Sequence, residues 1–210
     1  MSILNKGFDR RNYSFEIRAE EDSNEGAVIT GRPIIYNSKT DLGWFEEIIE
    51  KGALDKADLS DVRFLVNHDT SKIPLARSRK DKDSTMQLKV DEKGLSIRVN
   101  LDVENNSEAK NLYSAVQRRD ISGMSFMFGI SDEEWENLDS DYPTRRIKAI
   151  SNVVEVSAVT FPAYEDTEIS TRNKEALNKA KKTVETVRDN NAESSDLELE
   201  KLKAKYLYNL

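Results

Sequence analysis

Few residues in this chain could carry out chemistry, because it contains one histidine and no cysteine. The absence of cysteine excludes disulfides, cysteine nucleophiles and thiolate metal sites. One histidine cannot build the usual zinc sites, which need several imidazole ligands. An enzyme made from this sequence would therefore be a hydrolase running on serine, histidine and carboxylates, or on carboxylates alone.

Ser125 is the candidate nucleophile. It lies in a stretch with strand alternation, Ile121–Ile130. Alternation places the bulky apolar side chains on one face, namely Met124, Phe126, Phe128 and Ile130. Ser125 then points to the opposite face, where Gly123 and Gly129 leave room for a substrate backbone. The same pattern also fits an ordinary strand serine beside a bulge.

His68 is the only imidazole that could activate such a serine. It follows a predicted strand, Val62–Val66, and strict alternation would continue the face of Val62, Phe64 and Val66. Histidine is the usual general base, because its ordinary pKa lies near working pH. The alternative is a turn histidine beside Asp69.

Glu155 is the candidate third member, a single carboxylate within the apolar strand Val153–Val159. A buried carboxylate needs a partner, and a catalytic triad needs a group that orients the base. The alternatives are a solvent-facing edge position or a pair with Arg145 or Arg146. Asp69 is a competing orienter, although a side chain next to His68 in an extended strand points to the opposite face.

Period-two patterns dominate the first 160 residues and predict a mainly β core. The predicted strands are Tyr13–Arg18, Ala27–Tyr36, Asp61–Asn67, Thr85–Val90, Leu95–Leu101, Ile121–Ile130, Arg145–Ile150 and Val153–Thr160. Asp91–Gly94 is expected to form a hairpin turn. Gly52–Leu59 is predicted as a short helix, and Ser107–Asp120 as a longer one with Ser107 as its N-cap.

The acidic run Asp132–Asp141 is either a loop or a strand extension. The character of the chain changes after Pro162, which predicts a β-rich domain over residues 1–164 and a charged helical or flexible tail over 165–210. Within the tail, Asn173–Arg188 and Leu197–Leu210 have helical patterns, and Asp189–Asp196 resembles a linker.

The composition limits the partners. The net charge is −7, and no basic block is dense enough for a run of phosphates, so nucleic-acid binding is not expected. No apolar run could span a bilayer and no signal peptide is visible, which places the expected site of action in a cytoplasm. No metal or cofactor is expected.

Several motifs in order resemble the HK97-type prohead (capsid maturation) serine protease family of tailed phages. The motifs are Gly31–Asn37, Phe45–Ala53, Asn67–Asp69, Leu75–Ser78, Ser122–Phe126 and Glu155–Ala163, within Ala27–Tyr164. The resemblance implies an α+β, mainly β fold with a herpesvirus-assemblin-like β-barrel core, flanking helices and a helical or partly disordered C-terminal tail. It also implies that Ser125 is the nucleophile and His68 the base.

The herpesvirus enzymes use a Ser-His-His triad, which this chain cannot build with one histidine. We therefore expect Glu155 in the third position. Arg145 and Arg146 suggest the arginine pair near the herpesvirus oxyanion hole, but they equally fit an ordinary charged strand start and are left out of the catalytic set.

The resemblance implies a serine endopeptidase that acts in the host cytoplasm, inside the immature phage capsid. Its expected partners are the major capsid protein and scaffold segments, and a homo-oligomer stays open. Two rival interpretations are a non-catalytic assembly or scaffold protein on the same fold and an unrelated β-rich binding module. We expect Ser125 and His68 on neighbouring strands at one accessible surface, and self-trimming between Glu165 and Asp196.

Overall fold

The computed structural model shows a mainly β protein, with two helices among the residues that it describes. It describes residues 9–13, 17–23, 26–80, 82–160 and 173–186. The strands are β1 (Asp9–Tyr13), β2 (Ile17–Asp22), β3 (Gly26–Ile35), β4 (Lys39–Asp41), β5 (Glu46–Ile49), β6 (Asp61–Val66), β7 (Ala76–Arg79), β8 (Met86–Asp91), β9 (Gly94–Asn100), β10 (Gly123–Glu136) and β11 (Thr144–Val159). The helices are α1 (Ser107–Gln117) and a second helix over residues 173–186.

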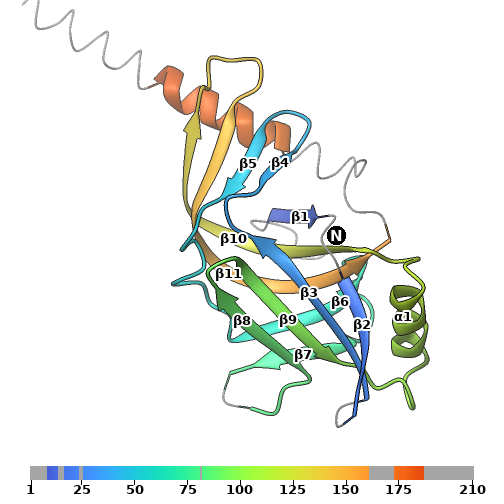
Figure 1. Cartoon of the computed structure of the whole chain (residues 1–210). Coiled ribbons are helices and arrows are strands. Elements are labelled where there is room, and N and C mark those ends of the chain that lie inside the picture. Colours follow the sequence, from blue (N-terminus) through green and yellow to red (C-terminus); the bar gives the residue numbers. More distant parts are fainter. Residues whose placement is uncertain (1–8, 14–16, 24–25, 81, 161–172, 187–210) are drawn as a thin grey trace, which may run out of the picture.

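The described strands form two sheets around a shared apolar core (Figure 1). The seven-stranded sheet has the order β1-β10-β11-β5-β4, and β6 and β7 extend from β11. The four-stranded sheet has the order β2-β3-β9-β8. Helix α1 packs its apolar stripe, Ala109, Leu112 and Val116, beside β2 and β3.

The strand β11 organises the larger sheet because several strands pair with it. It pairs antiparallel with β10, and its other edge pairs in parallel first with β5 and then with β6. We predicted two strands here, Arg145–Ile150 and Val153–Thr160, but the backbone stays extended through the polar pair Ser151 and Asn152. Register shifts in the pairing between β10 and β11 accommodate the break in the alternating pattern, so β11 is one continuous strand.

The predicted helix at Gly52–Leu59 is wrong. Gly52 has φ +90°, and the segment folds into successive turns in which the N–H groups of Asp55 and Ala57 donate three residues back. The Asp58 N–H then donates to the Ser151 carbonyl of β11 at 2.8 Å. A helix cannot start from the left-handed backbone of Gly52, and the contact with β11 fixes the turn instead.

Other boundaries also differ from the predictions. Tyr13 ends a strand of the larger sheet and Ile17 begins one of the smaller, so Tyr13–Arg18 is not one strand. The N-cap of α1 is Asn106, whose side chain accepts from the Glu108 and Ala109 N–H groups, and not Ser107. The acidic run continues β10 as far as Glu136, which confirms the strand extension for that part.

The hairpin between β8 and β9 is confirmed, and it explains Gly94. This residue has φ +133°, and a Cβ there would lie 2.0 Å from the Ile34 carbonyl oxygen of β3. Only glycine allows both the backbone angle and the close approach.

The second helix packs against the loop between β4 and β5 (Figure 1). Leu177 is buried, the Asn173 side chain donates to the Leu42 carbonyl at 3.5 Å, and the Lys174 ammonium lies 4.6 Å from the Trp44 ring centroid. This confirms a helix for residues 173–186 of the predicted Asn173–Arg188. The segments Asp189–Asp196 and Leu197–Leu210 lie outside the described residues.

Candidate active site

Ser125 lies in β10, between β1 and β11 of the larger sheet. In β10 the apolar residues Met124, Phe126 and Phe128 point into the core, and Ser125 lies on the other face, as the alternation predicts. Its register partner in β11 is Ser157, and paired residues of antiparallel strands share a face, with Cα atoms about 5 Å apart. Ser125 is fully buried, so the predicted accessible surface is wrong.

His68 follows β6 in a tight turn. The Asp69 N–H donates to the Val66 carbonyl at 3.1 Å, and the two central residues, Asn67 and His68, have φ +50° and +58°. Positive φ at both central positions is the signature of a type I′ turn. A left-handed conformation is uncommon for histidine, and such backbone persists where the surroundings hold it in place.

Asn67 ties this turn to the end of β11. Its N–H donates to the Ala158 carbonyl at 2.9 Å, and its side-chain amide donates to the Thr160 hydroxyl at 3.1 Å. The Thr160 N–H returns a hydrogen bond to the Asn67 amide oxygen at 2.9 Å. Asparagine suits the position because it tolerates the left-handed region and its side chain bonds neighbouring backbone. The turn that carries His68 is therefore pinned to the strand that carries Glu155.

The turn also changes the face on which His68 lies. Val62 and Phe64 point into the core, and continued alternation would send His68 the same way. Instead the imidazole Nδ1 lies 2.5 Å from Glu155 Oε1, on the opposite face. The prediction that His68 continues the Val62 face is wrong because the extended backbone ends at Val66.

Glu155 contacts the imidazole with one oxygen and a hydroxyl with the other. Its Oε2 accepts a hydrogen bond from Ser157 Oγ at 2.5 Å, and the residue is 1% exposed. Both carboxylate oxygens therefore have partners, as a buried carboxylate requires. Because Glu155 holds Nδ1, the imidazole keeps Nε2 for another partner.

Asp69 does not orient His68, and neither Arg145 nor Arg146 pairs with Glu155. The Asp69 carboxylate accepts from the Ser71 hydroxyl and N–H at 2.5 and 3.1 Å, and these bonds hold its pKa below the ordinary value. Asp69 therefore bonds Ser71, whereas Glu155 bonds His68. Arg145 and Arg146 contact other carboxylates, and they lie ten and nine residues from Glu155 along β11, roughly 30 Å in an extended strand.

Ser157 is the member of this group that sequence reasoning missed. Its hydroxyl donates to Glu155 and accepts from the His68 N–H at 3.1 Å. The signal was present, because in Glu155-Val-Ser157 the two polar side chains share a face of the strand. Ser157 also pairs with Ser125, so it lies between the candidate nucleophile and the backbone of His68.

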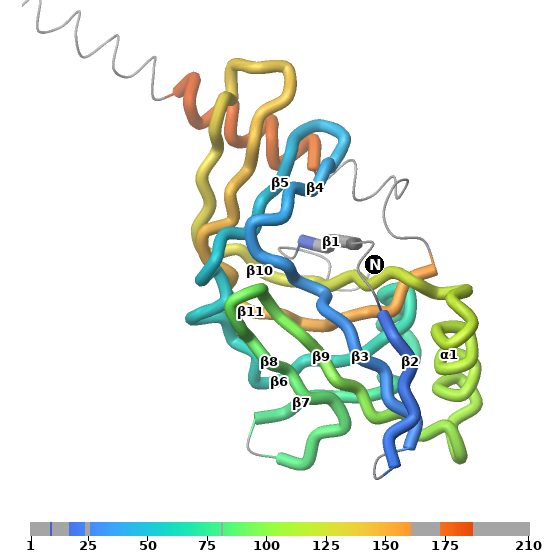
Figure 2. The backbone as a smooth tube through the Cα atoms, viewed as in Figure 1, coloured from blue at the N-terminus to red at the C-terminus, as the bar shows by residue number. Residues whose placement is uncertain are grey.

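The prediction that Ser125 and His68 lie on neighbouring strands is also wrong. β10 and β6 do not pair with each other, because both flank β11. Register runs from Ser125 to Ser157 and on to Leu65, three residues before His68. In the larger sheet β11 thus lies between β10 and β6 (Figure 2), and the turn after β6 brings His68 to the face of Glu155 and Ser157.

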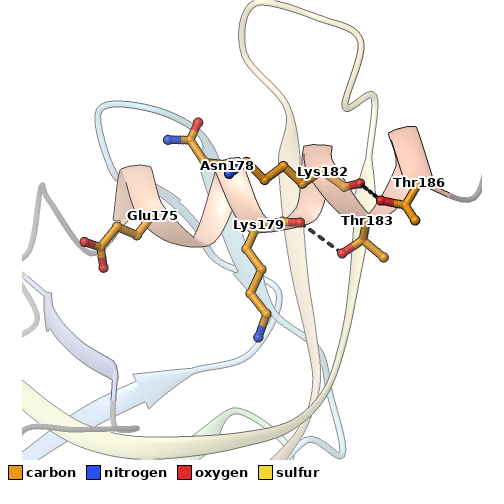
Figure 3. A pocket seen from close by; sticks show the side chains of 6 residues that line it. All are labelled: Glu175, Asn178, Lys179, Lys182, Thr183 and Thr186. Atoms are coloured by element: carbon orange, nitrogen blue, oxygen red, sulfur yellow. Dashed lines mark hydrogen bonds between the residues drawn. The ribbon is translucent and has the colours of Figure 1, made fainter.

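Hollows elsewhere in the described structure have no comparable chemistry. One runs along the second helix and is lined by Glu175, Asn178, Lys179, Lys182, Thr183 and Thr186 (Figure 3). Its threonine hydroxyls donate to carbonyls four residues back on the same helix. Among the described residues, no three His or carboxylate side chains group closely enough to hold a metal ion, and no described helix is long and apolar enough to cross a membrane.

One of three comparisons with known proteins agrees with the motifs. A family model described as caudovirus prohead serine protease matches residues 13–182, past the Ala27–Tyr164 range of the quoted motifs. A search among curated proteins gave no match. Among solved structures, the bacteriophage T4 capsid assembly protease, gp21, is similar at 10% identity and a TM-score of 0.38, over 73% of this chain and 97% of that one.

Proposed function

The chain belongs to the caudovirus prohead serine protease family and acts in phage capsid maturation, and on this premise we propose that Ser125, His68 and Glu155 form its catalytic triad. The observation that carries the proposal is the 2.5 Å contact between His68 Nδ1 and Glu155 Oε1, on the face of the sheet that Ser125 shares. This family connection also argues against the non-catalytic assembly protein and the unrelated binding module.

The proposed roles follow from the hydrogen bonds. Glu155 fixes the imidazole through Nδ1, which leaves Nε2 to take the proton from the Ser125 hydroxyl. Oγ then attacks the scissile carbonyl, and backbone N–H groups hold the oxyanion. His68 passes its proton to the leaving amine, and afterwards it activates the water that hydrolyses the acyl-enzyme.

Ser157 is proposed as a positioning residue. One hydroxyl links the backbone of His68 to the second oxygen of Glu155. The imidazole and the carboxylate that orients it are therefore tied together at two points. A base held in this way loses little conformational freedom when it takes up the proton.

The substrates and setting are proposals that rest on the family. We propose cleavage of scaffold segments and of the major capsid protein, inside the immature capsid in the host cytoplasm. The herpesvirus-assemblin-like barrel belongs to the same proposal, and the apolar core that the two sheets share supports it. A homo-oligomer is proposed from the family alone.

Ser125→Ala tests the nucleophile. We expect cleavage of scaffold-bearing capsid protein to fall by about 10⁴-fold or more, as for other triad serines. Ser131→Ala is the matched control, because Ser131 is an exposed serine on the same strand. A serine-reactive phosphonate should label the wild type and Ser131→Ala but not Ser125→Ala. Wild-type cleavage by Ser125→Ala would overturn the assignment.

Self-trimming between Glu165 and Asp196 is the second part of the proposal. Proteolysis needs a segment that can extend, and residues 173–186 are held in a packed helix, so the cut should fall outside them. Intact-mass measurement of the wild type and Ser125→Ala, incubated at high concentration, tests this. A wild type that keeps its full mass while it cuts scaffold would contradict it.

A further inference from the structure

The strand β1 lies along the outer edge of the strand that carries Ser125. Asn12 pairs with Ser125, Tyr13 with Met124, and Asp9 with Phe128, in an unbroken antiparallel register. The inner edge of β10 is taken by β11. Residues 9–13 of the chain therefore complete the sheet directly beside the candidate nucleophile.

A protein substrate commonly binds as an added strand. An extended peptide gains main-chain hydrogen bonds by adding to a sheet edge, and side-chain pockets then supply selectivity. Because β11 occupies one edge of β10, an added strand beside Ser125 can bind only at the other. In this structure the chain's own β1 holds that edge.

An ion pair fastens the start of β1. The Asp9 carboxylate accepts from the Arg145 guanidinium of β11 at 3.1 Å. Arg145 is buried, and it also contacts Glu133 and Glu47, so its position is fixed independently of β1. Asp9 can thus be released while the group around Arg145 stays in place.

The family match gives a second, independent observation. It begins at residue 13, so β1 except for its last residue precedes the matched region, whereas all of β10 lies inside it. In this chain, β1, which lies almost entirely outside the matched region, pairs with β10, which lies inside it.

We infer that the outer edge of β10 is the docking edge for an extended peptide segment of the substrate, and that β1 is an intramolecular competitor for it. The inference rests on the proposed role of Ser125. Substrate binding then requires β1 to leave, which costs the backbone hydrogen bonds of β1 and the Asp9–Arg145 pair. An apparent affinity is reduced by the fraction of molecules in which the edge is open.

A structural alternative predicts different behaviour. Proteins cover sheet edges with short charged strands to prevent edge-to-edge association, and β1 carries Asp9, Arg10 and Arg11. If β1 has only this protective role, releasing it should promote aggregation and lower stability without improving substrate binding.

The double variant Arg10→Pro/Arg11→Pro in the full chain tests the inference. Adjacent residues of an edge strand alternate in the direction of their N–H groups, so one of the two prolines removes an N–H that faces β10. Arg10→Gln/Arg11→Gln is the charge-matched control that keeps both N–H groups. We expect the proline variant to lower KM for a scaffold-derived peptide about tenfold, if the edge is open in about one wild-type molecule in ten.

Asp9→Asn should also lower KM, but by less, since it weakens the Asp9–Arg145 pair and keeps the backbone hydrogen bonds of β1. Its matched control is Asp22→Asn, which removes the 2.6 Å Asp22–Arg98 pair on an edge strand of the smaller sheet and should leave KM unchanged.

A binding measurement separates this inference from the triad. A labelled peptide with the sequence of residues 7–15 should bind Ser125→Ala/Arg10→Pro/Arg11→Pro about tenfold more tightly than Ser125→Ala alone, whatever the chemical role of Ser125. If other experiments showed that Ser125 is not the nucleophile, this difference in peptide affinity should still be observed. Equal peptide affinities together with an unchanged KM in the proline variant would overturn the inference.

Discussion

Two groups of polar side chains are centred on buried residues ten positions apart on β11, Arg145 and Glu155, and they differ in whether a member can gain or lose a proton. The first surrounds Arg145, whose guanidinium contacts Glu133 at 2.8 Å, Asp9 at 3.1 Å and Glu47 at 3.3 Å. A guanidinium stays protonated in proteins, so this group is a permanent ion-pair cluster.

The second group joins His68, Glu155 and Ser157. It has one carboxylate, one hydroxyl and an imidazole whose ring can gain or lose a proton. Its backbone is also unusual, since His68 is left-handed. The comparison shows that burial of charge alone does not identify a catalytic site. The group around Arg145 joins strands, whereas the one around His68 combines a titratable ring with a fixed orienting carboxylate.

Glu155→Gln should have the largest effect on activity, and it tests whether the group around His68 differs in role from the group around Arg145. The amide keeps the volume but loses the charge that stabilises the imidazolium, and we expect kcat/KM to fall by about 10³- to 10⁴-fold. Thermal unfolding of the same preparation should change little. If the variant is less stable but its folded fraction keeps wild-type activity, Glu155 has a structural role like that of the residues around Arg145.

Arg145→Met should show the opposite behaviour. Glu47, which is almost fully buried, would lose the guanidinium, and an uncompensated buried charge costs about 3–5 kcal/mol. Denaturant unfolding should reveal that loss, while kcat of the folded protein stays near the wild-type value. A collapse of kcat with wild-type stability would contradict the structural role of Arg145.

Ser157→Ala should reduce kcat about tenfold with KM unchanged. It removes one hydrogen bond to a charged carboxylate, worth about 1.5–3 kcal/mol, and it leaves the His68 N–H without that acceptor. Ser157→Thr retains a hydroxyl and should restore most of the rate. If Ser157 only stabilises the strand, both variants should shift unfolding and spare kcat.

Asp91→Asn tests a surface ion pair in the smaller sheet and should have the smallest effect. The Asp91 carboxylate accepts two hydrogen bonds from Arg32 at 2.7 Å, and this contact, with the Lys93 N–H, holds its pKa well below the ordinary value. A depressed carboxyl pKa stabilises the fold above the unfolded-state pKa, and this contribution is lost as pH falls through the folded-state pKa.

The variant should therefore unfold at a slightly lower temperature at pH 7, and the difference should narrow as the pH falls below about 4. Solvent screening keeps the effect small, and added salt should reduce it further. Activity should be unchanged. A difference from wild type that grows on acidification would contradict this ion-pair explanation.

The sequence by itself determined the local features of the site. Alternation in β10 placed Ser125 opposite the core-facing Met124 and Phe126, and composition left His68 as the only imidazole. The ordered motifs from Gly31 to Ala163 indicated the family. These inferences depend on short-range periodicity and on residue identity, which a sequence displays directly.

Tertiary structure decided which side chains meet. The expected contact between His68 and Glu155 joins residues 87 positions apart, and only the fold turned His68 off the face of Phe64 and bonded Asp69 to Ser71. Only the fold placed Asn12 beside Ser125, and Ser157 between Ser125 and the backbone of His68. Strand register arises from pairing between residues far apart in the chain. The left-handed turn persists because the surrounding structure stabilises an unfavourable backbone. Neither cause produces a periodic pattern in the sequence.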